Sequence, residues 1–422
     1  MTVRRLVIIA CIAALLWGSP WLQRVVFASA NLRPPATPIP ATYFGLHIHW
    51  ATQTDWPNIP FSAWRLTGDN VGWYDLEPKK GQWDFRLLDK DVDLAEKHHV
   101  QLMLTLVFTP TWASARPSEA PSSGHPGYTA EPTDINDWRD YVRTVATRYK
   151  GRIQAYEIWN EPNSPQFYTG SVEKLVLLAK EAYTILHQVD PSVIVASPPS
   201  AGNKVSFLDT YLRNGGGRYC DVIGYHFYVT PEPPEKMLDW IAQVKDIMAK
   251  YGQSNKPLWD TETGYYIYSQ TTEVKPNGPF IVVPADEAAA YVARAYILNW
   301  ASGVSRLNWY GWNDDYMGLA ASRGAIRKPA AEAYERVQQW LSGAVMRSCK
   351  SDESDTWVCE ITRAGEYGGY IVWNPHGNKN FTIPGAWRVR WQVHLSGPNR
   401  NVSGAKDTEI GIKPILLENK AQ

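Results

Sequence analysis

The sequence predicts an α/β protein, namely a (β/α)8 TIM barrel followed by a small C-terminal antiparallel β-sandwich-like domain. Eight apolar runs of strand length alternate with stretches of helix length over about 300 residues, which is the repeat of such a barrel. These runs are almost continuously apolar, as strands buried on both faces of a parallel sheet require. After about Gly343 the pattern changes to short runs separated by Gly, Pro and Asn, which is typical of an antiparallel unit.

The individual elements follow from the spacing of apolar residues. Barrel strands are predicted at 43–49, 63–67, 100–108, 153–159, 193–197, 222–227, 257–261 and 304–310. Apolar residues at three- and four-residue spacing predict helices at 85–98, 134–149, 172–189, 236–251, 286–302 and 329–341. Strands of the tail are predicted at 357–361, 369–373, 380–383 and 387–394. An open doubly wound sheet is the alternative, but no Gly-rich phosphate loop follows any strand.

The N-terminus has the pattern of a targeting segment. Arg4 and Arg5 precede an apolar run at 6–17, and a small-x-small exit ends at Ala30. We expect a signal peptide and a secreted or periplasmic protein. Extended through residue 27, the same run becomes an uncleaved inner-membrane anchor, so a membrane tether through residues 6–27 is the alternative.

The predicted organisation therefore has three parts. Residues 1–30 are the signal peptide or anchor, 31–342 the catalytic barrel and 343–422 the C-terminal β domain. The Pro-rich stretch 31–40 reads as a linker or an edge strand.

Cysteine spacing suggests one disulfide. Cys349 and Cys359 flank a polar segment, which predicts a hairpin closed by a disulfide in an oxidising compartment. Cys11 lies inside the targeting segment. Cys220 lies in an apolar run, and we expect a buried thiol rather than a nucleophile.

Composition and charge exclude two broad classes. With 44% hydrophobic residues the chain can bury a core, which excludes overall disorder. The 42 basic and 42 acidic side chains balance, so we expect no nucleic-acid partner. The chain has 20 Trp and 23 Tyr but only 10 Phe. Flat rings with a polar edge suit wet ligand clefts, although a Trp-rich core is the simpler explanation.

Polar side chains follow the predicted strands, where a barrel places its reactive groups. They include His47, His49, Arg65, Asn160, Glu161, His226, Tyr228 and Glu262, with Trp112, Trp309 and Trp312 as neighbouring aromatics. Two carboxylates at two strand ends suit glycosidic bond cleavage, which needs a proton donor on one side of the bond and a carboxylate on the other. We expect no metal or other cofactor.

Two motifs carry a family resemblance. Tyr156-Glu157-Ile158-Trp159-Asn160-Glu161-Pro162 resembles the fourth-strand signature of the retaining clan A glycoside hydrolases. Trp259-Asp260-Thr261-Glu262-Thr263-Gly264 resembles their seventh-strand nucleophile signature. The two-domain plan is similar to family 39 and to the bacterial exopolysaccharide endoglycosidases grouped with it.

This resemblance implies a role for each site residue. Glu161 would be the acid/base and Glu262 the nucleophile. Asn160 would bind the hydroxyl next to the reacting carbon, while Arg65 and Tyr228 would orient Glu262. The resemblance further implies that His226 flanks the nucleophile or the sugar, and that the floor under the sugar is Trp309 or Trp312.

Several residues have alternative interpretations. Glu157 is either the acid or a buried partner of an arginine. His47 and His49 are either a metal-binding pair or sugar contacts, but the fifth strand offers none of the further His ligands that a metal site would need. Asp260 would raise the pKa of Glu262 if it points inward. Trp112, together with other loop tryptophans, belongs either to the core or to a long cleft.

We therefore expect an exported, monomeric, retaining glycoside hydrolase that cleaves internal β-glycosidic bonds of a polysaccharide. A biofilm exopolysaccharide or a plant-type glycan would suit as the substrate. The alternatives are a transglycosylase with the same site, a non-catalytic carbohydrate-binding matrix protein, and a metal-dependent hydrolase.

Overall fold

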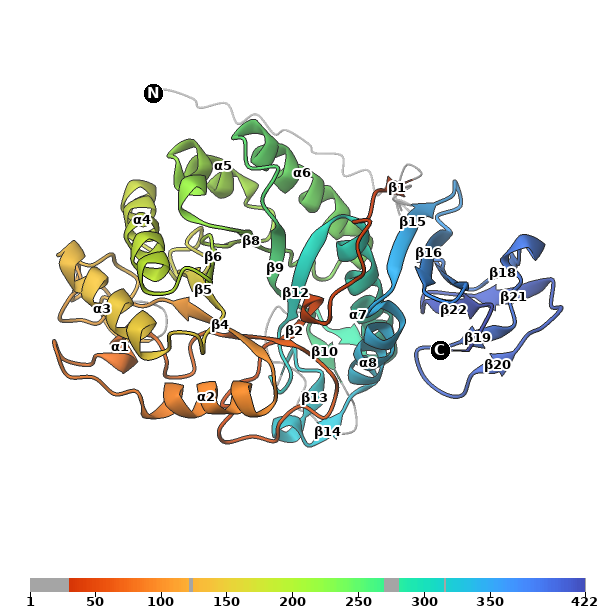
Figure 1. Cartoon of the computed structure of the whole chain (residues 1–422), viewed down its shortest axis with the longest axis horizontal. Coiled ribbons are helices and arrows are strands. Elements are labelled where there is room, and N and C mark those ends of the chain that lie inside the picture. The colour runs from red at the N-terminus through yellow and green to blue at the C-terminus, as the bar shows by residue number, and fades with distance from the viewer. Residues whose placement is uncertain (1–29, 121–123, 269–280, 315, 422) are drawn as a thin grey trace, which may run out of the picture.

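The computed structural model describes residues 30–120, 124–268, 281–314 and 316–421. A parallel sheet closes into a barrel (Figure 1), in the order β6-β5-β4-β3-β2-β12-β9-β8-β7, and a bridge between Ala196 and Val222 completes the ring. Its strands are β2 (Phe44–Leu46), β3 (Ala63–Leu66), β4 (Gln101–Leu106), β5 (Ala155–Ile158), β6 (Ile194–Ala196), β7 (Ser200–Ala201), β8 (Ile223–His226), β9 (Leu258–Thr263) and β12 (Val304–Trp309). The predicted barrel is confirmed.

The fifth barrel strand is divided into two segments. β6 pairs with β5 and β7 pairs with β8, and Pro198 and Pro199 lie between them. Because proline has no N–H for the ladder, the pairing is interrupted at this point. Nine segments therefore occupy the eight predicted strand positions.

The helices surround the barrel and match the predicted ranges within one residue at each end. They are α1 (Trp73–Leu76), α2 (Arg86–Lys97), α3 (Ile135–Arg148), α4 (Val172–Val189), α5 (Val205–Arg213), α6 (Met237–Lys250), α7 (Ala285–Ala301) and α8 (Pro329–Leu341). α1 and α5 are additional to the predicted helices.

The expectation that a helix follows every strand is wrong for the first strand. Residues 47–62, all of which the structure describes, form turns and irregular chain without a helix. Pro57 and Pro60 in this stretch disfavour a helix. The connection after β12 is also irregular and carries the short pair β13 (Ala320–Ala321) and β14 (Ile326–Arg327). A second short pair, β10 (Ile267–Tyr268) and β11 (Val283–Pro284), follows β9.

α7 is covered on all sides. Every residue from Ala288 to Ala301 is buried. On one side Tyr296 donates its hydroxyl to the Gly45 carbonyl of the barrel at 3.1 Å. α8 and β15 contact the helix as well (Figure 1). A helix that is buried on all sides is expected at such a position between layers.

The C-terminal region forms an antiparallel sheet beside α7 and α8 (Figure 1). Its strands are β15 (Val345–Ser351), β16 (Trp357–Arg363), β17 (Tyr367–Trp373), β22 (Ile415–Glu418), β19 (Trp391–Val393) and β20 (Arg400–Asn401), with β18 (Lys379–Thr382) and β21 (Asp407–Ile410) as a separate pair. β1 (Asn31–Leu32) pairs with the edge strand β15, so the Pro-rich stretch begins with an edge strand of the C-terminal sheet.

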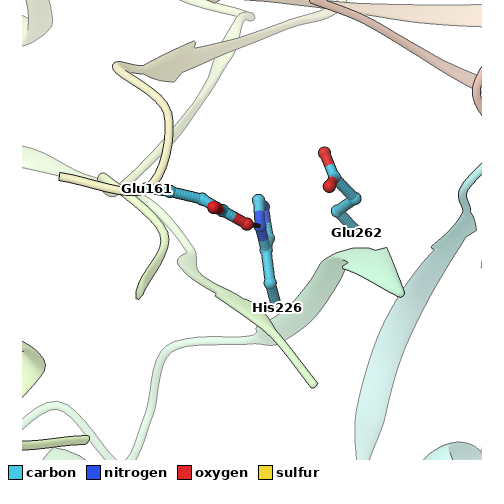
Figure 2. Close-up of side chains that lie close together, drawn as sticks. All are labelled: Glu161, His226 and Glu262. Atoms are coloured by element: carbon cyan, nitrogen blue, oxygen red, sulfur yellow. Dashed lines mark hydrogen bonds and ion pairs between the residues drawn. The ribbon is translucent and has the colours of Figure 1, made fainter. Parts of the chain in front are cut away.

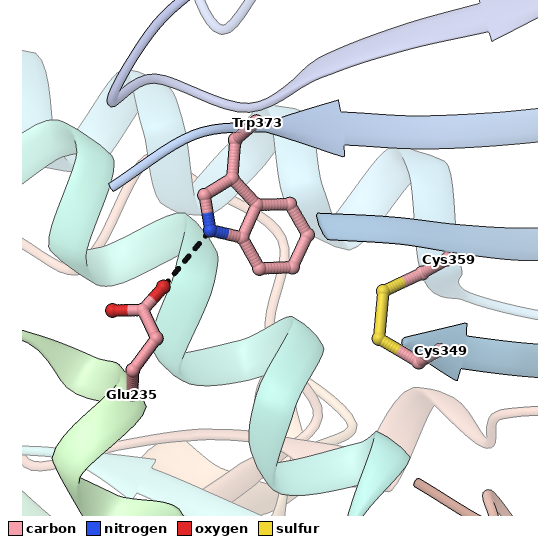
Figure 3. The surroundings of a disulfide bond; sticks show 4 residues. All are labelled: Glu235, Cys349, Cys359 and Trp373. Atoms are coloured by element: carbon pink, nitrogen blue, oxygen red, sulfur yellow. Dashed lines mark hydrogen bonds between the residues drawn. A yellow bond between two sulfur atoms is a disulfide. The ribbon is translucent and has the colours of Figure 1, made fainter. Parts of the chain in front are cut away.

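Two chain segments connect the barrel and the C-terminal sheet, and they are hydrogen-bonded to each other. The Ile39 N–H donates to the Ala344 carbonyl and the Gly343 N–H donates to the Ile39 carbonyl, both at 2.8 Å. A buried polar contact adds to this junction (Figure 3), because the indole N–H of Trp373 donates to Glu235 at 2.9 Å. Glu235 also forms an ion pair with Arg294 of α7.

The structure joins Cys349 and Cys359 in a disulfide between the neighbouring strands β15 and β16 (Figure 3). Cys220 is a buried free thiol, and burial raises its pKa. Residues 1–29, which contain most of the predicted signal or anchor, lie outside the described residues. Among the helices of the described part of the chain, none is long and apolar enough to span a membrane.

Candidate active site

Polar side chains from several barrel strands meet at the C-terminal ends of these strands. Glu161 follows β5, His226 ends β8 and Glu262 lies near the end of β9, and the three side chains point toward one another (Figure 2). One ligand atom of each lies within 4.8 Å of those of the other two. The carboxylate side chains are 16% and 12% exposed, so both reach solvent.

A β-bulge gives Glu262 its direction. Leu307 of β12 pairs with Asp260, and Trp309 pairs with Thr263, so β9 has one extra residue between these pairs. In a regular strand Asp260 and Glu262 would share a face. A bulge changes the direction of the side chains beyond it. Asp260 accordingly accepts the Phe227 N–H at 3.4 Å and is fully buried, whereas Glu262 faces the cluster.

The loop after β5 gives Glu161 its direction. Trp159 and Glu161 both have left-handed backbone, with φ of 64° and 40°. Such conformations cost roughly 1–3 kcal/mol each for residues other than glycine and persist only where the surroundings hold them. Trp159 is held here, because it is completely buried and its indole N–H donates to the Phe167 carbonyl at 2.9 Å.

Arg65 of β3 is the centre of the hydrogen-bond network. Its guanidinium donates to Glu157 at 2.7 Å, to Glu262 at 2.6 Å and to the Asn160 side-chain oxygen at 2.8 Å. Arg65 and Glu157 are fully buried, so Glu157 is the internal partner of an arginine. Tyr228 donates to the other oxygen of Glu262 at 2.8 Å. Both oxygens of Glu262 are therefore held in place by donors.

Glu161 lies in a different environment. Burial raises its pKa to about 7, although the charges of Arg65 and Lys204 act against this shift. Its neighbour His226 shares a hydrogen bond between Nδ1 and Glu161 Oε1 at 2.8 Å. Burial lowers the pKa of His226 to about 4, so this imidazole is neutral near pH 7. Two carboxyl groups in such contrasting surroundings can take the roles of acid and nucleophile.

His47 and His49 have separate partners. His47 is buried, with Nε2 at 3.3 Å from Arg65 and 3.9 Å from Glu262, and burial followed by the charge of Arg65 lowers its pKa. The His49 ring lies 3.2 Å from Asp69; burial acts to lower its pKa, but the hydrogen bond to Asp69 and its charge raise it. Their polar partners therefore differ, although both rings pack against Tyr310.

Glu161, His226 and Glu262 have the spacing of metal ligands. The Arg65 guanidinium, however, already contacts Glu262 and stands beside His47. A divalent cation in this position would be repelled by the arginine. The chemistry of the donor set therefore fits an acid/base pair better than a metal site.

The predicted sugar floor needs correction. Trp309 and Trp312 are both completely buried. Trp309 stacks with Tyr265 and Tyr296 in the core. Besides Tyr228, an aromatic ring at the site is that of Tyr310, which sequence reasoning missed. It lies 5.1 Å from the ring of His47 and 5.0 Å from that of His49. Since alternate strand residues face opposite sides, the burial of Trp309 leaves Tyr310 to face the site.

Trp112 lies in the loop after β4 and is half-buried, and its predicted role as a sugar contact stays a prediction. Its indole N–H donates to the Glu77 carbonyl at 2.8 Å, and its ring packs edge-on against Trp73. Lys80 lies over the ring at 5.7 Å. These contacts belong to the loops after β3 and β4 rather than to the carboxylate cluster.

A barrel with one acid after the fourth strand and a second on the seventh is the architecture of the clan A glycoside hydrolases, and this is the class that the fold and the site resemble. The model of glycosyl hydrolase family 10 matches residues 64–180. A β-xylosidase from Geobacillus stearothermophilus is 23% identical over 265 residues, covering 54% of this chain and 51% of the relative. Endo-1,4-β-xylanase 3 from Arabidopsis thaliana is 23% identical over 323 residues, covering 73% and 38%. The chain thus spans about half or less of the length of these curated relatives.

Solved structures share the fold at low identity. A family 39 glycoside hydrolase from Bacteroides cellulosilyticus WH2 superposes with a TM-score of 0.70 at 20% identity, covering 90% of this chain and 81% of that one. A family 39 β-xylosidase from Caulobacter crescentus gives 0.63 at 14% identity, with coverage of 94% and 98%. These similarities support a glycoside hydrolase.

Proposed function

We propose that the protein is an exported, retaining β-glycoside hydrolase in which Glu161 is the acid/base and Glu262 the nucleophile. The observation that carries this proposal is the distance of at most 4.8 Å between one oxygen of each carboxylate. Retaining enzymes have carboxyl groups about 5–5.5 Å apart, whereas inverting enzymes need about 6.5–9.5 Å to admit a water molecule.

In the first step a Glu262 oxygen attacks the anomeric carbon as the bond from that carbon to the leaving oxygen breaks. Glu161, protonated below its pKa of about 7, gives its proton to the leaving oxygen. With its own proton on Nδ1, His226 donates to Oε1 of Glu161 and leaves Oε2 to carry the transferred proton. The product of this step is a covalent glycosyl-enzyme.

In the second step the ionised Glu161 accepts a proton from water, and the water oxygen bonds to the anomeric carbon. The bond to Glu262 breaks, and both carboxyl groups return to their starting states. Arg65 and Tyr228 support this step, because their hydrogen bonds stabilise the departing carboxylate. Each step inverts the configuration at the anomeric carbon, so the two steps together retain it.

For the substrate we propose a β-linked polysaccharide cleaved at internal bonds. Since curated relatives are named xylanases and a xylosidase, β-1,4-linked xylan is the first substrate to test. A bacterial exopolysaccharide remains the second. Export is supported by the N-terminal pattern and by the disulfide, which suits an oxidising compartment.

The test is a polysaccharide panel assayed with wild type, Glu161→Gln and Glu262→Gln, with Glu332→Gln on the exposed face of α8 as the matched control. We expect the two site variants to lose activity while the control retains it. NMR should show the β-anomer as the first product. Azide should rescue Glu262→Ala with an inverted product and Glu161→Ala with a retained product.

The same panel separates the alternatives. A transglycosylase would give longer products when acceptor sugars are added. A matrix-binding protein would keep its function in both Glu→Gln variants, and a metal-dependent hydrolase would lose activity with a chelator. Full activity in either Glu→Gln variant would end the catalytic assignment.

A further inference from the structure

A cavity of about 480 Å³ lies between the loop after β2 and the loop after β12. Its lining residues are His49, Trp50, Gln53, Thr54, Asn313, Asp314 and Arg323. The volume is within the range of about 300–1,000 Å³ that is usual for small-ligand sites.

The two loops are fixed to each other at the base of this cavity. The His49 N–H donates to the Asn313 side-chain oxygen at 2.8 Å, and the Asn313 amide donates back to the His49 carbonyl at 2.7 Å. Asp69 contacts the His49 ring at 3.2 Å and accepts the Trp50 N–H at 3.3 Å. The cavity walls are therefore preformed, which lowers the cost of binding a ligand.

The cavity adjoins the carboxylate cluster. His49 lines it, and the His49 ring packs against Tyr310 at 5.0 Å. Tyr310 in turn packs against His47, whose Nε2 lies 3.9 Å from Glu262. Two ring contacts thus connect the cavity to the proposed nucleophile.

An exposed indole stands at the edge of the cavity. Trp50 is 43% exposed and has a left-handed backbone with φ of 50°. Strain of this kind at an exposed aromatic residue is often found at functional sites. Of the four exposed large hydrophobic residues in the described part of the chain, Trp50, Tyr316 and Ile326 lie on these same two loops. Such clustering marks binding surfaces.

The polar lining suits hydroxyl groups. Gln53, Thr54 and Asn313 offer neutral donors and acceptors. Arg323 and Asp314 in the same lining carry opposite charges. Balanced charge beside an exposed indole favours a neutral sugar ring over an ionic ligand.

We infer that this cavity is a subsite for a neutral sugar ring of the substrate beyond the ring at the cleavage point, with Trp50 as its stacking platform. The inference rests on the proposed function and extends it, because a subsite of this kind makes the protein select chains rather than single sugars.

The kinetic test compares β-1,4-xylotetraose with an aryl β-xyloside. The quantity compared is the kcat/KM for the tetrasaccharide divided by the kcat/KM for the aryl xyloside. We expect this ratio to fall about tenfold in Trp50→Ala and to stay near the wild-type value in Trp50→Phe, which keeps an aromatic ring. Ile281→Ala, at the exposed large apolar residue of the described chain that lies outside these two loops, is the matched control and should leave the ratio unchanged. An equal loss on both substrates in Trp50→Ala would overturn the inference.

A binding test keeps the two proposals distinguishable. Calorimetry uses Glu262→Gln with xylotetraose, cellotetraose and a glucuronic-acid-bearing xylotetraose. We expect a neutral tetrasaccharide to bind, and to bind about tenfold more weakly when Trp50→Ala is added. Binding without hydrolysis in wild type would reject the proposed function and keep the subsite. Undiminished binding in Trp50→Ala, binding of the acidic sugar alone, or no binding of any of them would reject the subsite.

Discussion

Arg65→Met is expected to destabilise the fold strongly, because the arginine is the sole ion-pair partner of Glu157 among the described residues. Arg65 and Glu157 are both completely buried, and Glu262 is largely buried. Removing one partner of a buried ion pair leaves an uncompensated charge and costs about 3–5 kcal/mol. Domains have a free energy of unfolding of only about 5–15 kcal/mol. We expect the free energy of unfolding to fall by this amount at pH 7, as measured by urea denaturation with near-UV circular dichroism as the signal.

The design includes a rescue and a control. Adding Glu157→Gln to Arg65→Met removes the orphaned charge and should restore at least about 1 kcal/mol. Arg152→Met breaks the exposed pairs with Asp93 and Glu96 and should cost no more than about 1 kcal/mol. The reasoning would be refuted if Arg65→Met and Arg152→Met lowered the free energy of unfolding equally. It would also be refuted if the double variant were no more stable than Arg65→Met.

Three further predictions concern the site and the C-terminal sheet. Because burial raises the pKa of Glu161 to about 7 and the acid must be protonated, kcat/KM should fall about tenfold per pH unit above pH 7. With a substrate that has an activated aryl leaving group, Glu161→Gln should no longer show this fall at alkaline pH. A fall that persists in the variant would contradict the assignment of Glu161 as the acid. Tyr228→Phe removes one hydrogen bond to Glu262, worth about 1.5–3 kcal/mol when the acceptor is charged, so kcat/KM should fall roughly 10- to 100-fold. A loss below threefold would count against the role of Tyr228. Replacing Cys349 and Cys359 by Ser opens a short loop and should cost about 2–3 kcal/mol; the wild type in reductant should melt at the temperature of the variant, and a difference between them would indicate another cause.

The sequence predicted the barrel well because its strands are buried on both faces and therefore stand out as apolar runs. The helices were predicted within one residue because their apolar residues recur at helical spacing, on one side in α3 and α4 and on all sides in α7. The missing helix after β2 could not be predicted from a repeat, since the repeat implies a helix after every strand. The two prolines in this stretch, Pro57 and Pro60, did indicate that no helix forms there.

The residue types of the site were predictable from the sequence, but the directions in which the side chains point were less so. Glu161 and Glu262 stand out by motif, but the orientation of Glu262 relative to Asp260 depends on a bulge in the pairing of β9 with β12. A bulge is a property of two strands, so neither strand alone reveals it. In the same way, Tyr310 could be distinguished from Trp309 and Trp312 only once the core packing of both tryptophans was known.

The two crossings between the barrel and the C-terminal sheet lie side by side, tied at Ile39, Gly343 and Ala344. One unit could rotate about a single connection, whereas two connections that are hydrogen-bonded to each other resist such a rotation. Together with β1 on the outer edge of β15, this arrangement makes rotation of one unit against the other depend on breaking backbone hydrogen bonds first. The paired connections thus hold α7, which lies between the barrel and the C-terminal sheet, at a constant position behind β12.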